Sequence, residues 1–225
     1  MNQITANFPH GWFAPELPGY RETPTTYGYF EYDCLPPIEA QLNGDFAWLT
    51  PMDQRVEKEM LPHWEADRKR VGITTNLERM VTEVTRRGFV LPDIFLRFMR
   101  SEILQKRVPS CTACYFDAPE RPVDAPAPGT GMLVRFMNDQ QWCILWYLYV
   151  EKSGAHAVLA SDRALDLELD ELEDGNGEPS LYLCAQDFEA FLYRFWLENS
   201  AWYVLHEKHR PLSSAEERYL THYRH

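Results

Sequence analysis

The spacing of apolar residues differs from one part of the chain to another. Between residues 75 and 88 the spacing is helical, with one apolar stripe at i, i+3, i+4 and i+7. That stripe consists of Leu77, Met80, Val81 and Val84. Thr75 followed by Glu78 is a capping-box pattern, and Gly88 suits the left-handed position after a helix. This segment is therefore predicted to be an amphipathic helix.

Two further helices flank it. Pro92 and Asp93 suit the first turn of a helix, so residues 92–99 are predicted to be helical, with Phe95 and Phe98 in the buried face. The earlier segment 53–71 is charged, and Pro62 is expected to break or kink it.

The C-terminal half is predicted to be a sheet closed by helices. Strands are predicted at residues 112–117, 132–137, 142–150, 155–161 and 181–184. Residues 142–150 (WCILWYLYV) are apolar on both faces, which indicates a central strand covered on both sides. A helix is predicted to start at Asp187, and a last helix at residues 213–223 opens with the capping box Ser213 to Glu216.

Residues 1–52 have no clear period. They hold seven of the 16 prolines and many aromatic residues, so they are too irregular for a helix and too aromatic for a solvated tail. We expect an extended arm that lies across the surface of the main domain, with its rings as anchors and a short strand near residues 27–33. The predicted division is an arm and helix over residues 1–72 and an α+β domain over residues 73–225.

The net charge restricts the classes of partner that the chain is expected to bind. The 225 residues contain 34 acids and 22 Lys and Arg, a formal charge of −12. Such a chain is a poor ligand for nucleic acid or an anionic membrane, and it favours a basic partner or serves solubility. The longest apolar run has nine residues and the N-terminus lacks signal-peptide features, so a cytoplasmic protein is expected.

The acids are concentrated at residues 166–178, which hold seven acids and no base. Leucines alternate with the carboxylates there, so we expect the leucines to dock inward and the carboxylates to fan outward. The candidate partner-binding residues are Asp166, Glu168, Asp170, Glu171, Glu173 and Asp174. The alternative is a solvated edge that prevents association between sheets.

The cysteines offer the other candidate chemistry. Five thiols, an odd number, argue for reduced cysteines. Cys111 and Cys114 have the spacing of a redox pair or of half a zinc site. Histidines that could complete such a site stand three apart at two places: His206 and His209, and His222 and His225. The alternative is two half-buried structural thiols. No other enzyme or cofactor signature is present, and no metal or cofactor is expected.

The order of these elements resembles the SUKH superfamily, which includes fungal cell-wall regulators and bacterial immunity proteins. The resemblance rests on Leu77–Met99, with Leu91-Pro92 opening the second helix, on Leu133–Phe136, on Trp142–Val150 and on Ala185–Leu192. It covers about residues 74–205. Ser101–Ser110 replaces the glycine-containing turn that is usual in the family, and residues 1–70 have no counterpart.

The resemblance implies a mixed, mainly antiparallel sheet flanked by helices, and a non-catalytic module that binds and neutralises a polymorphic toxin, often a nuclease. Two other hypotheses remain open. One is a metal- or thiol-dependent protein that uses Cys111 and Cys114. The other is a self-associating structural or regulatory protein in which the arm packs on a second copy. The identity of the partner and the oligomeric state stay open.

Overall fold

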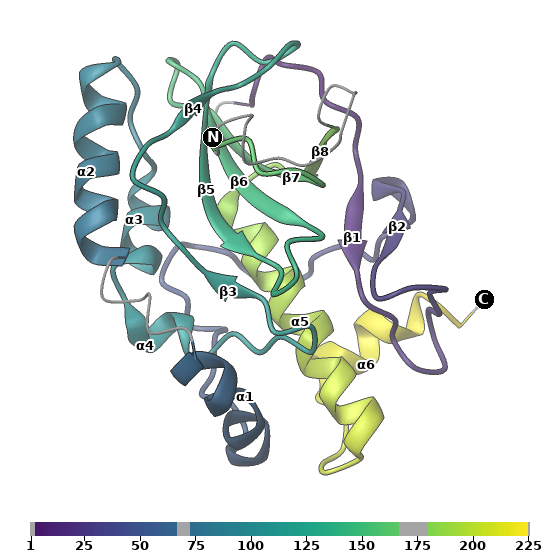
Figure 1. Cartoon of the computed structure of the whole chain (residues 1–225). Coiled ribbons are helices and arrows are strands. Elements are labelled where there is room, and N and C mark those ends of the chain that lie inside the picture. Colours follow the sequence, from purple (N-terminus) through teal and green to yellow (C-terminus); the bar gives the residue numbers. More distant parts are fainter. Residues whose placement is uncertain (1–2, 67–72, 167–179, 225) are drawn as a thin grey trace.

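The computed structural model describes residues 3–66, 73–166 and 180–224 (Figure 1). The fold is α+β, with a central, mainly antiparallel sheet flanked by helices, as the sequence predicts. The sheet has the strand order β3-β5-β6-β7-β8, and β4 also pairs with β5. These strands are β3 (Tyr115–Phe116), β4 (Val123–Asp124), β5 (Met132–Asn138), β6 (Leu145–Val150), β7 (His156–Ser161) and β8 (Leu181–Ala185).

The sheet is buried on both faces, which confirms the prediction from the apolar run in β6. All six residues of β6 are buried. Alternate side chains serve two separate apolar clusters, because successive strand residues point to opposite faces. Trp146 and Leu148 face the helices, whereas Tyr147 and Tyr149 face the other side. The strand begins at Leu145, three residues later than predicted.

The described residues form the helices α1 (Gln54–Ala66), α2 (Ile73–Arg86), α3 (Asp93–Met99), α4 (Glu102–Gln105), α5 (Phe188–Glu207) and α6 (Ser214–Thr221). Of these, α2, α3 and α5 cover one face of the sheet, whereas α1 and α6 pack against α5. In Figure 1, α5 runs behind the strands and α2 and α3 lie beside them. Phe188 of α5 is central to this packing, since its ring lies 5.0 Å from Phe95 and 5.2 Å from Phe136 in edge-to-face geometry.

Several ends of the helices follow the sequence signals. The start of α2 does not, because Thr75, the predicted N-cap, lies inside a helix that already includes Ile73. Ser213 caps α6 with a complete capping box to Glu216, and Asp187 caps α5. Gly88, with φ +83°, follows α2 as predicted. Pro62 is expected to interrupt the first helix, but α1 continues through it. The lost bond is to the carbonyl of Lys58, an exposed residue, so water can replace the missing donor.

The first part of the arm belongs to the sheet. Residues 9–11 extend the edge of β8, since the Gly11 amide donates to the Leu183 carbonyl at 3.1 Å and the Leu183 amide donates to the Pro9 carbonyl at 2.8 Å. Phe8, only 2% exposed, packs into the apolar cluster on the sheet face opposite the helices. The arm thus covers both an edge and a face of the sheet, rather than only its outer surface.

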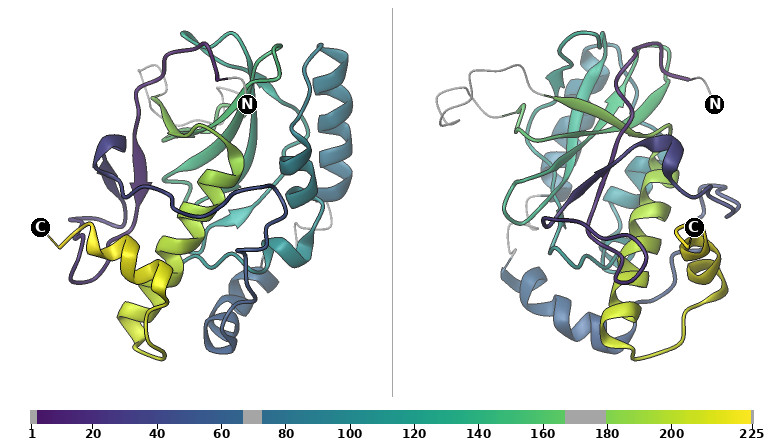
Figure 2. Two further views of the ribbon diagram at one scale, coloured as in Figure 1. Left: turned by 180° about the vertical axis from the view of Figure 1, so that it is seen from behind. Right: turned by 90° about the vertical axis from the view of Figure 1, so that its right-hand side faces the viewer.

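The arm then forms a ribbon and crosses α5. β1 (Trp12–Ala14) pairs with β2 (Gly28–Phe30), a shorter version of the strand predicted at residues 27–33, and a short 3₁₀ turn follows at Tyr32–Cys34. The next segment passes over α5 on its way to α1 (Figure 2, left). Phe46 and Leu49 of this segment join the same apolar cluster as the sheet and helices. The division of the chain at residue 72 stays a prediction, and the arm shares its core with the rest.

Among the residues that the structure describes, no helix has the length and apolarity needed to cross a lipid bilayer.

Candidate functional site

A buried carboxylate joins the arm to the two C-terminal helices. Glu198 of α5 is 1% exposed and accepts hydrogen bonds from three partners. The Trp12 indole donates at 2.8 Å, the Arg21 guanidinium donates at 2.7 and 3.0 Å, and the Tyr219 hydroxyl donates at 2.5 Å. We call these four residues, together with Tyr223, the Glu198 cluster.

Electrostatics within the Glu198 cluster favour the ion pair. Burial alone raises the pKa of Glu198, but the charge of Arg21 and the donated hydrogen bonds outweigh it, so the pKa is lowered. For Arg21, burial lowers the pKa, and attraction to Glu198 raises it further than burial lowers it. The guanidinium also lies 4.2 Å from the centre of the Phe30 ring and donates to the Tyr223 hydroxyl at 3.0 Å. The pair is therefore charged at neutral pH.

Two more buried acids hold later parts of the arm in the same way. Glu189 of α5 accepts from the Gly44 amide at 2.8 Å and from the Trp48 indole at 2.9 Å. Asp139, after β5, accepts from the Tyr27 hydroxyl at 2.6 Å. Both acids are 3% exposed. Both carboxylates therefore lie inside the fold and accept hydrogen bonds from the arm.

A fourth carboxylate holds the start of the chain. Glu151 accepts from the Thr5 amide at 2.7 Å, from the Thr5 hydroxyl at 2.9 Å and from the Ala6 amide at 3.2 Å. Burial raises the pKa of Glu151, and the bonds from Thr5 and Ala6 more than offset it, so the pKa is lowered. Four acids of the main domain therefore fix the arm from its first residues to residue 48.

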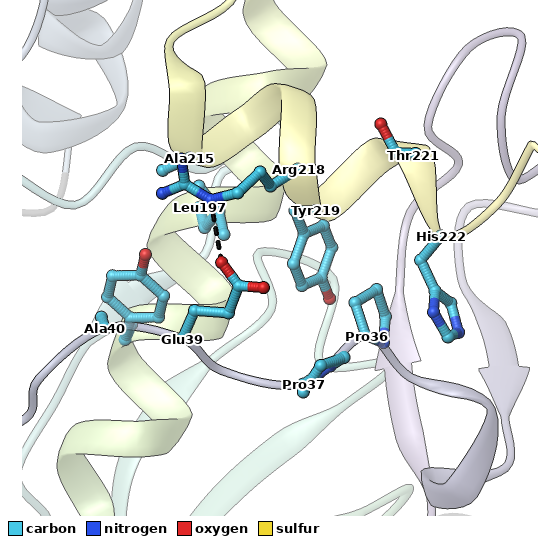
Figure 3. A pocket seen from close by; sticks show the side chains of 11 residues that line it. Pro36, Pro37, Glu39, Ala40, Leu197, Ala215, Arg218, Tyr219, Thr221 and His222 are labelled. Carbon is cyan, nitrogen blue, oxygen red and sulfur yellow. Dashed lines mark hydrogen bonds and ion pairs between the residues drawn. The ribbon is translucent and has the colours of Figure 1, made fainter.

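A groove opens beside the Glu198 cluster, between the arm and α6 (Figure 3). Its volume is about 410 Å³, and Tyr219, whose hydroxyl contacts Glu198, forms part of its wall. Pro36 and Pro37 line the arm side. An ion pair of 2.8 Å between Arg218 and Glu39 crosses the rim. The charges of Arg218 and Glu39 at the rim are therefore paired with each other.

The acidic docking residues are placed only in part. Asp166 lies at the end of the described segment, and its carboxylate does not point outward. It forms a bidentate ion pair with Arg135 of β5, with distances of 2.9 and 3.0 Å, and its side chain is 5% exposed. The physical reason is Arg135, a buried cation on the sheet that needs a counter-charge. The other five, Glu168, Asp170, Glu171, Glu173 and Asp174, lie outside the described residues.

Arg135 also donates hydrogen bonds to acceptors other than Asp166. Its guanidinium donates to Asp117 at 3.0 Å and to the Asn138 side-chain oxygen at 2.7 Å, and it lies 4.8 Å from the centre of the Trp142 ring. The Tyr147 hydroxyl donates to Asp166 at 3.2 Å. We call Arg135, Asp166, Asp117, Asn138 and Tyr147 the Arg135 cluster. It fixes the chain just before residue 167 to the sheet.

The predicted cysteine pair lies in an environment that suppresses thiolate formation. Burial raises the pKa of Cys111 well above its usual value, and the nearby Cys114 raises it further. Burial also raises the pKa of Cys114, more than hydrogen bonds from Ser110 and Thr112 lower it. Within residues 3–66, 73–166 and 180–224, all five cysteines are free thiols and no group of three metal-binding side chains gathers. These observations favour the interpretation as structural thiols.

The histidines considered as partners of that pair have other surroundings. The His206 ring stacks on Trp202, with centroids 4.6 Å apart. His222 contacts the Cys34 carbonyl at 3.2 Å. The side chain of His209 is buried, and His225 lies outside the described residues. The histidines that the structure describes therefore form no zinc site with the two thiols.

Sequence reasoning missed the Glu198 cluster, although a signal was present. Glu189 and Glu198 are acids within a mostly apolar 20-residue helix, where a buried carboxylate needs a partner. Arg21 is the only base in residues 1–53. A single cation in the arm and acids in a mostly apolar helix are complementary, but nothing in the sequence shows which of them form a pair.

Comparison of the chain with protein-family models, with curated proteins and with solved structures finds no match. The arguments about function therefore rest on the residues and their geometry.

Proposed function

We propose that this protein is a non-catalytic, protein-binding module of SUKH type that neutralises a basic toxin by covering its active site. The resemblance of residues 74–205 supports a SUKH-type immunity protein. The distribution of charge over the chain supports a basic partner.

One observation carries the proposal: the net negative charge of the chain comes from two stretches of the sequence, while four buried acids of the main domain are bonded to the arm. Residues 1–53 hold seven acids and one base, Arg21, which is buried in the Glu198 cluster. Residues 166–178 hold seven acids and no base. The remainder holds 20 acids and 21 bases. The net charge is therefore confined to the arm and to the acidic stretch.

Exposure supports a role in association. The one basic residue of residues 1–53 is buried, whereas six of the seven acids there are exposed, namely Glu22, Glu31, Asp33, Glu39, Asp45 and Asp53. Toxin domains that act on nucleic acids have basic active sites, because those sites grip phosphates. A partner with local negative charge would associate with them faster and block substrate access.

The acidic stretch is the proposed contact, without Asp166, whose carboxylate is committed to Arg135. The test co-expresses the protein with the toxin domain encoded next to its gene and measures growth. We expect the wild-type chain to restore growth and to bind the purified toxin domain. Reversing Glu168, Asp170, Glu171 and Glu173 to Lys should weaken binding at least about tenfold.

A matched variant tests the assignment of the surface. Reversal of Glu22, Glu31, Asp33 and Asp45 to Lys makes the same change in net charge on the arm, and we expect it to leave most of the binding intact. If only the arm variant fails to bind, the contact surface is the arm. If neither reversal weakens binding, or if no toxin gene adjoins this gene, the proposal is wrong.

A further inference from the structure

A second cavity lies where the start of α1 meets the C-terminal half of α5. Its volume is about 670 Å³, within the range of small-molecule sites. Four segments form it: residues 50–56, 107–109, 196–203 and 209–216. Because these segments are far apart in sequence, the cavity exists only in the folded chain.

Its walls combine apolar surface with a buried imidazole. Met52, Val56 and Trp196 supply apolar surface. His209 also lines the cavity, and its side chain is only 3% exposed. Neither ring nitrogen has a hydrogen-bond partner among the described residues, and Nδ1 lies 3.8 Å from the Glu207 carboxylate, too far for a direct bond. A buried polar group without a partner is costly, so a ligand that pairs it gains that free energy.

A cation without a carboxylate partner lines the same cavity. The Arg107 guanidinium donates to the Leu49 carbonyl at 3.1 Å and forms no ion pair with any described carboxylate. The neighbouring Arg210 differs, since Glu216 holds it through two bonds of 2.6 and 2.7 Å. Arg107 is therefore the one guanidinium of this cavity whose charge the described residues leave uncompensated.

We propose that this cavity binds a small organic monocarboxylate with an apolar, ring-sized body. Arg107 would pair with the carboxylate through its planar fork, and His209 would form a second polar contact. Met52, Val56 and Trp196 would cover the apolar body. The carboxylates of Asp53 and Glu216 also line the cavity, and they disfavour ligands of higher negative charge such as phosphates.

Two aromatic acids, phenylacetate and indole-3-acetate, serve as probes with the full-length protein. Titration calorimetry, with tryptophan fluorescence as a second readout because Trp196 lines the cavity, measures binding. We expect saturable binding at one site, at least about tenfold tighter than that of the neutral counterpart phenylacetamide. Inorganic phosphate should not compete.

Three variants locate the site. Arg107→Gln should abolish the preference for the acid over the amide, and Arg107→Lys should keep part of it. His209→Phe should weaken binding of both probes. Arg218→Gln, which removes a guanidinium from the groove of Figure 3, should leave binding unchanged. Thermal unfolding of each variant shows whether it is folded.

The proposal fails if neither acid shows saturable binding up to about 10 mM, if the amide binds as tightly as the acid, or if folded Arg107→Gln binds like the wild type. Competition by phosphate would show that the cavity binds anions in general, and the proposed class of ligand, a monocarboxylate, would then be wrong. None of these outcomes bears on toxin binding, which is measured with a different surface and a different partner.

Discussion

Two buried clusters, one around Glu198 and one around Arg135, each contain an ion pair between an arginine and a carboxylate. The two ion pairs join different parts of the fold. In the Glu198 cluster a carboxylate is the centre, and its donors come from the arm and from α6. In the Arg135 cluster a guanidinium is the centre, and its acceptors lie within 31 positions of it in sequence. Arg21 and Glu198, by contrast, are 177 positions apart. The first cluster joins the arm to the C-terminal helices, and the second joins the segment that ends at residue 166 to β5.

The clusters also differ in access to water. Glu198 and Arg21 have side chains that are 1% and 5% exposed, so neither charge can be solvated if its partner is lost. In the Arg135 cluster, Arg135 and Asp166 have side chains that are each 5% exposed, and only Asp117, at 30%, reaches water. A charge near water loses less when its partner is removed, because water replaces part of the interaction. Stability should therefore depend less on the bond between Arg135 and Asp117 than on the two buried pairs, because water can replace part of that bond.

The largest expected effect follows from removing the centre of the first cluster. Glu198→Ala leaves Arg21 charged and buried without a counter-charge, so the free energy of unfolding should fall by about 3 to 5 kcal/mol. Urea unfolding followed by circular dichroism measures it. Glu217→Ala removes an exposed acid from α6 and serves as the matched control, with little change expected.

A double variant separates the lost pair from the lost packing. Replacing both partners, as in Arg21→Met with Glu198→Leu, removes the uncompensated charge and should recover part of the stability that Glu198→Ala loses. If the double variant is no more stable than Glu198→Ala, the ion pair is not the reason for the loss.

A smaller effect is expected in the second cluster. Arg135→Met leaves Asp166 without its bidentate partner, while Asp117 can turn to water, so the loss should be about 1 to 3 kcal/mol. The same urea titration applies. Arg55→Met, which removes an exposed guanidinium, is the control. A loss as large as that of Glu198→Ala would contradict the argument from solvent access.

The smallest expected effect is the contribution of Glu198 to the pH dependence of the free energy of unfolding. Its pKa is lower in the folded chain than the ordinary value of 4.5, so its charge stabilises the fold above that pH. As the pH falls below 4.5 towards the folded pKa, that contribution disappears. The stability difference between the wild type and Glu198→Gln should therefore shrink on acidification, by at most about 1.4 kcal/mol per pH unit.

Thermal unfolding at a series of pH values from about 7 down to about 3 measures this difference. Glu217→Gln should follow the wild type throughout. A difference that stays constant from about pH 5 to about pH 3 would mean that Glu198 does not titrate with a lowered pKa.

Local patterns predict the elements because the information for them is local. The stripe of α2, the Pro92-Asp93 start of α3 and the capping box of α6 all appear in the structure. Each depends on residues within one or two turns, where spacing alone decides which side chains share a face. The burial of β6 on both sides follows from its composition for the same reason.

Predictions that depend on contacts between residues far apart in sequence are confirmed only in part. The arm is expected on the outside, but Phe8 packs on the second face of the sheet and residues 9–11 pair with β8. The carboxylate of Asp166 is expected to face outward, and Arg135, 31 positions away, holds it inside. Both outcomes depend on what lies opposite in space, and spacing along the chain carries no information about that.

The sequence by itself determined the elements, the α+β class and the excess of negative charge, since these depend on composition and on near neighbours. Only the tertiary structure decided which acids remain on the surface. Asp139, Glu151, Glu189 and Glu198 are turned inward by donors of the arm. A buried charge requires a partner, and these partners, 112 to 186 positions apart, meet only when the chain is folded.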